Sequence, residues 1–157
     1  MNNFRILLFS FIACAGAHAQ CAPGGLAVVV PLASPTDGLS MAQLRKLVMG
    51  DVHTWPDKNK VTLVSADPDG AVFRCLITTA VRMTLPEYRK YMLNSEFRGD
   101  EPLHLKTVSS ATIAVRTVAA FPGAFSVVEG SSLPTLGGVV KILSINGKRP
   151  GEPGYPL

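Results

Sequence analysis

The stretch Gly24-Gly25-Leu26-Ala27-Val28-Val29-Val30-Pro31 is a continuous apolar run enclosed by glycines and a proline. Its short length and its valine content predict a β-strand. A strand with one face in water alternates polar and apolar residues. This run has no polar position, so both of its faces are expected to be buried. Such strands are typical of sheets that carry helices on both sides.

Two capping boxes predict where helices begin. Ser40 is followed three residues later by Gln43, and the helix that they open is expected to end at Gly50. Thr84 and Glu87 repeat the pattern, with a proline early in the first turn. Helices therefore follow the first strand and recur later in the chain.

The other expected elements alternate along the chain. Strands are predicted over residues 61–65, 124–128 and 139–145, helices over residues 71–82 and from Ser109 or Ser110 to about residue 120, a turn over residues 35–38 and a loop over residues 130–138. Because strands alternate with helices, the predicted fold class is α/β. The expected architecture is a three-layer sandwich built on a mostly parallel mixed sheet.

Length and composition limit what this chain can form. Its 157 residues, 47% hydrophobic and 17% charged, suffice for one domain with a core and are too few for two substantial ones. The charged fraction is too low for a disordered acidic or basic tail. The net charge of +4 can attract an anion, but it is not the basic footprint of a nucleic-acid-binding protein.

The segment 1–19 has the pattern of a secretory signal peptide. Arg5 supplies a positive start, residues 6–13 form a largely apolar run, and Ala17-His18-Ala19 offers small residues to a signal peptidase. Cleavage leaves residues 20–157 as a single periplasmic or secreted domain. No later run is apolar for long enough to predict a transmembrane helix.

A lipoprotein signal is the alternative to simple cleavage. Phe11-Ile12-Ala13-Cys14 is similar to a lipobox, although phenylalanine stands where leucine is usual. In that case Cys14 would carry a lipid anchor, and the protein would be tethered to a membrane.

Two cysteines remain after the predicted cleavage. Cys21 and Cys75 can pair in an oxidising compartment, and the loop that they close would be long. Alternatively, Cys75 is a small buried hydrophobe on a helix and Cys21 is a free thiol. The sequence leaves both states open.

The sequence contains no recognisable catalytic motif. It has no Gly-x-Ser-x-Gly, His-Glu-x-x-His, P-loop or dinucleotide fingerprint. His53 and His104 are far apart and lack a neighbouring cysteine or carboxylate at metal-ligand spacing, so both are expected on the surface or in loops. Asp67 and Asp69 resemble paired carboxylates, but an Asp-Pro-Asp-Gly loop needs them for its turn. The prediction is a protein that is not an enzyme and has no cofactor or metal.

One strand-to-helix joint has the pattern of an anion-binding site. The predicted strand 61–65 leads to a helix start, where backbone N–H groups at Gly70 and Ala71 are expected to be free. The Ser65 hydroxyl and the charge of Arg74 would add to them. Joints of this kind are also common without a ligand, in which case the arginine is simply solvated.

The single tryptophan, Trp55, precedes a proline in a loop. It either borders a binding site or folds back to cover the core, since an indole ring suits both places.

Four segments occur in an order that is typical of one protein family. They are residues 26–31, the series Leu39-Ser40, Leu44, Gly50 and Trp55, the strand entry at residues 121–125, and residues 140–147 with the closing Gly154-Tyr155-Pro156-Leu157. Together they resemble the phosphate-type periplasmic substrate-binding proteins of ABC transporters. The resemblance covers about residues 26–157 and implies a type 2 periplasmic-binding fold in a short, single-lobe form.

The sequence departs from this family where phosphate would bind. Full members are two-lobed clamshells that close on their ligand, and this chain resembles only the second lobe. The family's arginine followed by Ser-Gly-Thr is replaced by residues 64–71, which include Asp67 and Asp69, and Ser126 replaces a glycine. The fold is therefore expected to carry over better than phosphate binding.

The expected function is that of a secreted, non-enzymatic solute-binding-like protein. It would bind phosphate or another small oxyanion weakly through Ser65, Gly70, Ala71 and Arg74, with no nucleic-acid partner. The alternative is a ligand-free periplasmic interaction module that docks a membrane sensor, a transporter or a second copy of itself. A small hydrolase would need a serine or cysteine beside a base.

Overall fold

The computed structural model describes residues 21, 25–136 and 138–157. The predicted signal peptide and the alternative lipid-anchor site at Cys14 lie outside these residues. Within the part that the structure describes, no helix combines the length and apolar character needed to cross a membrane.

The first apolar run forms β1 (Leu26–Pro31), which lies inside a five-stranded sheet of order β4-β3-β5-β1-β6. Its residues alternate between two cores. Leu26, Val28 and Val30 pack on one side of the sheet, and Ala27 and Val29 on the other. All five are at most 1% exposed, so the predicted burial of both faces is confirmed.

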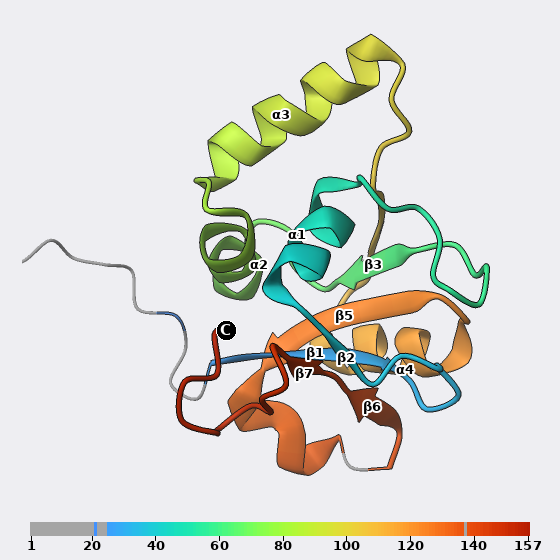
Figure 1. Ribbon diagram of the computed structural model, residues 1–157, viewed down its shortest axis with the longest axis vertical. Helices are drawn as coiled ribbons and strands as arrows, with labels where there is room; N and C mark the ends of the chain where they lie inside the picture. The colour runs from blue at the N-terminus through green and yellow to red at the C-terminus, as the bar shows by residue number, and fades with distance from the viewer. Residues whose placement is uncertain (1–20, 22–24, 137) are drawn as a thin grey trace, which may run out of the picture.

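Helices cover both faces of the sheet and complete the three layers. In Figure 1, α1 and α2 lie above β5 and β1, and α3 extends beyond them at the top. The opposite face packs against α4 (Ala111–Ala120), which contributes Ala114, Val115 and Val118 to the second core. The predicted α/β fold class is therefore confirmed.

Parallel and antiparallel pairs are equally frequent in the large sheet. β3 (Thr62–Ser65) runs parallel to β4 (His104–Thr107) and to β5 (Ala124–Glu129), whereas β1 runs antiparallel to β5 and to β6 (Val140–Ile142). β4 was not predicted. It is an edge strand whose four residues are all exposed, so its sequence lacks the apolar pattern of a buried strand.

Both capping boxes open helices at the predicted places. α1 (Met41–Met49) and α3 (Leu85–Arg98) each show the reciprocal pair of capping bonds. They end at Gly50 and Gly99, whose φ angles of 76° and 82° are easily reached only by glycine.

The helix predicted over residues 71–82 changes type along its length. It begins as α2 (Ala71–Leu76) and continues without a break as the π-helical η1 (Ile77–Val81). The change follows from the hydrogen bonding, because Arg82 donates its N–H to the carbonyl of Ile77, five residues earlier. The two pieces form one helical segment.

Two segments near the C-terminus differ from the prediction. The strand expected over residues 139–145 is divided between two sheets. β6 belongs to the main sheet, whereas β7 (Ser144–Ile145) pairs with β2 (Gly38–Leu39) in a small parallel sheet. A Cβ at Gly38 would run into the Ser144 hydroxyl, which would have to turn away, so glycine suits this close approach of the two strands. η2 (Gly130–Thr135) is a 3₁₀ helix where a loop was expected.

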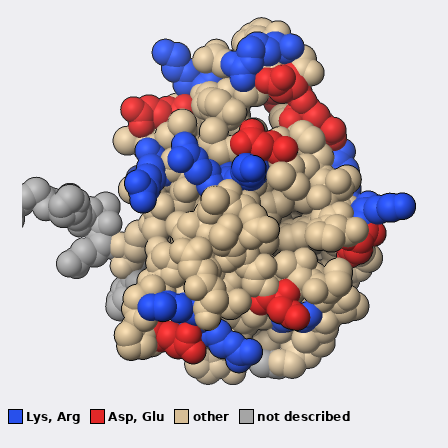
Figure 2. Space-filling model, in the orientation of Figure 1, with Lys and Arg blue, Asp and Glu red and all other residues tan. Residues whose placement is uncertain are grey.

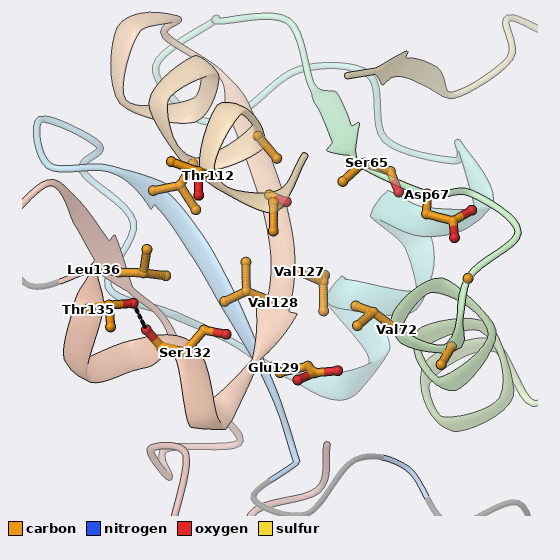
Figure 3. A pocket seen from close by; sticks show the side chains of 17 residues that line it. Ser65, Asp67, Val72, Thr112, Val127, Val128, Glu129, Ser132, Thr135 and Leu136 are labelled. Carbon is orange, nitrogen blue, oxygen red and sulfur yellow. Dashed lines mark hydrogen bonds between the residues drawn. The ribbon is translucent and has the colours of Figure 1, made fainter. Parts of the chain in front are cut away.

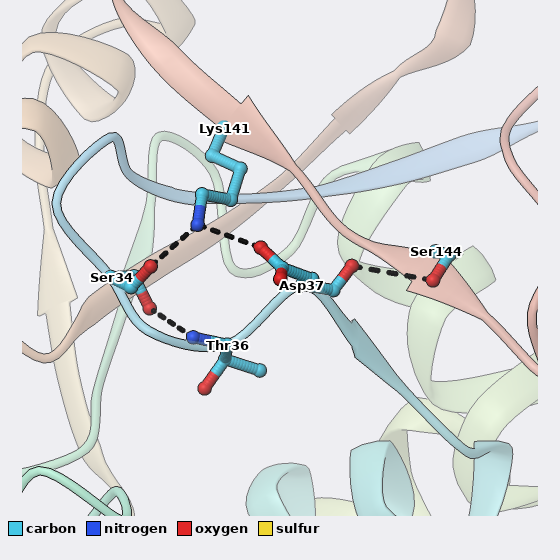
Figure 4. A network of polar contacts seen from close by, with 5 residues as sticks. All are labelled: Ser34, Thr36, Asp37, Lys141 and Ser144. Carbon is cyan, nitrogen blue, oxygen red and sulfur yellow. Dashed lines mark hydrogen bonds and ion pairs between the residues drawn. The ribbon is translucent and has the colours of Figure 1, made fainter.

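A polar network holds the β1–β2 connection against β6 (Figure 4). Lys141 Nζ donates to the Ser34 carbonyl and to Asp37 Oδ1, the latter at 2.8 Å. This hydrogen bond and the charge of Lys141 lower the pKa of the Asp37 carboxyl. The contact fixes a long loop to the edge of the main sheet.

Trp55 belongs to the core rather than to a binding rim. It is 7% exposed, and its indole N–H donates to the Gly123 carbonyl at 2.9 Å. Its ring meets the edge of Phe125 with 6.1 Å between centroids. Of the two interpretations of this residue, the structure supports the second.

The structure joins Cys21 to Cys75 by a disulfide, with 5.5 Å between the Cα atoms. Cys75 lies in α2 and is 7% exposed. The Thr79 hydroxyl is 3.6 Å from the Cys21 sulfur. The bond therefore attaches Cys21, which precedes β1 in the chain, to the helix that follows β3.

Breaking this disulfide should lower stability, because the bond restricts the unfolded chain. For cysteines 54 residues apart, the loop-entropy model gives about 4 kcal/mol. Cys75→Ser and Cys21→Ser should each lower the free energy of unfolding in urea, and the double variant should match the more affected single one. A free Cys75 thiol in mass spectra of the unreduced protein would contradict the bond.

Candidate functional site

A pocket of about 430 Å³ lies at the carboxyl ends of β3 and β5 (Figure 3). Its floor is apolar and includes Val72, Val115 and Val128. Polar side chains surround this floor, as Figure 3 shows for Ser65 and Asp67 on one side and for Thr112, Ser132 and Thr135 on the other. The pocket is therefore open to small polar ligands.

The chain topology puts two helix starts at this edge of the sheet. β3 and β4 are parallel, so the chain leaves both strands at the same edge of the sheet. It continues from β3 into α2 and from β4 into α4. In parallel sheets this edge is where ligands generally bind. Ala71 and Val72 of α2 and Ala111 and Thr112 of α4 accordingly line one pocket.

The first turns of these helices present backbone donors. The first N–H groups of a helix have no acceptor within the helix. At α4, the Ser110 hydroxyl accepts the N–H of Ile113, which leaves those of Ala111 and Thr112 without a capping side chain. At α2, no side chain caps the start. The pocket wall thus includes two helix starts at which some first-turn N–H groups have no side-chain cap.

Two parts of the predicted site need correction. Ser65, Gly70 and Ala71 do line the pocket, but the N–H of Gly70 donates to the Asp67 carbonyl at 3.1 Å and is not a free donor. Arg74 is exposed on α2 and is not among the residues that line the pocket, although it stands one helical turn beyond Ala71. The expected neutralising charge is therefore missing from the chain's own pocket.

The charged side chains that line the pocket are instead two carboxylates. Asp67 and Glu129 line the pocket, and none of its lining residues is a lysine or an arginine. In the view of Figure 2, basic and acidic side chains are interspersed above and below an uncharged band, so this face shows no broad field of one sign. The pocket combines anion-attracting amides with anion-repelling carboxylates.

The Asp67–Asp69 loop is a turn, as the simpler interpretation predicted. Asp67 Oδ1 accepts the N–H of Asp69 at 3.0 Å, and Asp69 itself forms an ion pair with Arg89. The two carboxylates therefore do not act together as a pair. Only Asp67 reaches the pocket.

The two histidines belong to another part of the surface. His53 is half-buried, His104 is exposed, and neither lines this pocket. Both lie near Glu101, whose pKa is lowered first by a hydrogen bond from Lys60 and then by the nearby positive charges. Among the described residues, no group of three or more His, Cys, Asp or Glu side chains is placed to hold a metal ion.

The sequence analysis missed Glu129, Thr112 and Ser132 as pocket residues. They come from the end of β5, the start of α4 and η2, which lie far from β3 along the chain. The cap at Ser110 was the one usable signal, since it predicts a second helix start. Its convergence with α2 depends on the strand order.

The fold is shared with phosphate-binding proteins of ABC transporters. The chain is similar to an ABC-type phosphate transport receptor from Vibrio cholerae, with 18% identity and a TM-score of 0.54, and to PstS from Borrelia burgdorferi, with 15% identity and a TM-score of 0.58. Each comparison covers 80% of this chain and 48% of the other. The chain thus spans about half the length of these proteins, and the predicted short, single-lobe resemblance is confirmed at the level of the fold.

Comparisons of sequence alone find no such likeness. No protein-family model matches the chain, and no curated protein is similar to it.

Two substitutions at Asp67 distinguish the effect of its hydrogen bond in the turn from the effect of its negative charge. Asp67→Asn keeps an acceptor for the N–H of Asp69 and should leave the melting temperature nearly unchanged. Asp67→Ala removes the acceptor and should cost about 1 kcal/mol in unfolding free energy. Equal losses in both variants, measured by thermal denaturation, would show that the carboxylate charge rather than the turn stabilises this loop.

Proposed function

We propose that this is an exported, non-enzymatic solute-binding-like protein that holds a small oxyanion, phosphate first, weakly in the pocket at the ends of β3 and β5. The observation that carries the proposal is the convergence of the first turns of α2 and α4 on one pocket. Amides at helix starts favour negative charge through both their hydrogen bonds and the helix dipole.

Hydroxyl groups supplement these amides. Ser65 lies at the end of β3 and Ser132 on the opposite wall, where the Thr135 hydroxyl already donates to the Ser132 carbonyl at 2.7 Å. Ser126, also in the wall, has a structural role. Its Oγ donates to the Val64 carbonyl at 2.7 Å, and the residue is only 1% exposed. A tetrahedral oxyanion has enough acceptor atoms to use donors from both walls.

The two carboxylates set the selectivity. Asp67 and Glu129 repel a fully ionised anion, but each can accept a hydrogen bond from an oxyanion that keeps a proton. Phosphate keeps at least one proton at neutral pH, whereas sulfate keeps none. Without a lysine or arginine in the wall, affinity is expected to be low and sensitive to salt.

Export and the absence of catalysis belong to the same proposal. The disulfide between Cys21 and Cys75 suits an oxidising compartment, and the pattern of residues 1–19 suits secretion. The residues that line the pocket include no histidine, cysteine or lysine, so the groups that most often activate a serine or act as nucleophiles are not among them.

Titration calorimetry with phosphate and sulfate tests the function. Phosphate should bind with a Kd of about 1 mM, and sulfate about tenfold more weakly. Glu129→Gln should narrow this preference, because a neutral amide no longer repels sulfate. Arg45→Glu, on the exposed surface of α1, is the control and should leave both affinities unchanged. No heat with either anion at millimolar concentration would refute the proposal.

A further inference from the structure

A second pocket, of about 540 Å³, lies between the segment Pro35–Leu39, α1 and the loop that follows α1. This volume is within the range that small-molecule sites usually have. Among the described residues, it has no lining residue in common with the pocket at the ends of β3 and β5. The function proposed above therefore leaves this second pocket without a role.

The second pocket is lined largely by apolar side chains. Leu39, Leu47 and Trp55 belong to the main core, and each is less than a tenth exposed. Pro35 and Pro56 are exposed and line the pocket from the two loops. A lining of this kind suits the apolar part of a ligand, since contact removes apolar surface of both partners from water.

Hydrogen bonds hold both loops of this pocket in place. On one side, Asp37 accepts a hydrogen bond from Lys141 of β6 (Figure 4). On the other, the backbone N–H of Trp55 donates to the Asn59 carbonyl, and its indole N–H donates to the Gly123 carbonyl. A pocket that is formed in advance loses little conformational freedom when a ligand binds.

The charged side chains of the lining are not equivalent. Among the described residues, Asp37 and Lys46 are the two that carry a charge into this pocket. Asp37 is paired with Lys141, whereas Lys46 takes part in none of the ion pairs formed within the described part of the chain. The pocket thus combines an apolar lining with one ammonium group that has no counter-charge, and an ammonium forms its strongest hydrogen bonds with anionic oxygens.

We propose that this second pocket binds a small carboxylic acid with an apolar body, with its carboxylate at Lys46 and its chain against Leu39 and Leu47. This site is separate from the proposed oxyanion pocket and does not depend on it. Two chemical features define the ligand. A body that is too short has no apolar surface to bury, and a positive head group is repelled by Lys46.

Tryptophan fluorescence tests the site, because Trp55 is the only tryptophan of the chain and lines this pocket. Hexanoate should change the emission of the purified protein in a saturable way, with a Kd of about 1 mM. Hexylammonium has the same chain and the opposite charge, and acetate has the same charge and a short body. Each should bind about tenfold more weakly than hexanoate, or less. The absence of a saturable change with hexanoate would overturn the inference.

Variants at Lys46 show which pocket is filled, since Trp55 also lines a smaller pocket that Lys46 does not reach. Lys46→Met keeps an unbranched side chain without the charge and should weaken hexanoate binding about tenfold, whereas Lys46→Arg should retain it. Arg45→Met, a matched change at an exposed position of α1 outside the pocket, should have no effect. Equal affinity of wild type and Lys46→Met would contradict the site.

A lysine in the last turn of a helix also stabilises that helix, so binding has to be measured apart from stability. Thermal denaturation of each variant provides this control, and the retained binding of Lys46→Arg separates the need for a charge from a general loss of structure.

Phosphate titration separates this inference from the proposed function. Because the two pockets are lined by different residues, hexanoate and phosphate should bind independently. Hexanoate binding without phosphate binding would refute the proposed function and keep the second site. Competition between the two anions would overturn the second site.

Discussion

The burial of β1 on both faces is the constraint on which the rest of the structure depends. Leu26, Val28 and Val30 need apolar cover on one side and Ala27 and Val29 on the other. Each valine or leucine buried in this way contributes about 1.5–3 kcal/mol, so leaving either face in water would remove a large part of the stability of a small domain. Helices therefore lie on both sides of the sheet, and their connections to it have to pass its edges.

The pocket is a consequence of that arrangement. β3 and β4 end at the same edge, and the helices that follow them begin there, so residues of two first turns line one pocket. Its carboxylates oppose this attraction for anions, and no basic residue lines it to restore the balance. On the function that we propose, the site therefore favours an oxyanion that keeps a proton.

The disulfide is attached to a wall of this pocket. It ties Cys21 to Cys75 of α2, the helix whose first turn forms part of the pocket wall. Thr79, near the Cys21 sulfur, lies in the π-helical continuation of the same segment. A bond that forms only under oxidising conditions thus supports the position of the pocket wall, and the wall should be less firmly held in a reduced chain.

Local signals in the sequence determined the buried strand, both capped helices and the α/β class, because an uninterrupted apolar run and a capping box act over a few neighbouring residues. The exposed edge strand β4 and the division of residues 140–145 between two sheets have no such signal, since pairing with distant strands decides them. The pocket residues also divide into those with a local sequence signal and those placed by tertiary structure. Ser65 and Ala71 were identified from one local joint, whereas Glu129 and Ser132 entered the pocket, and Arg74 stayed outside it, only through tertiary structure. The physical reason is that strand order and helix rotation are fixed by packing across the whole core, which no short segment encodes.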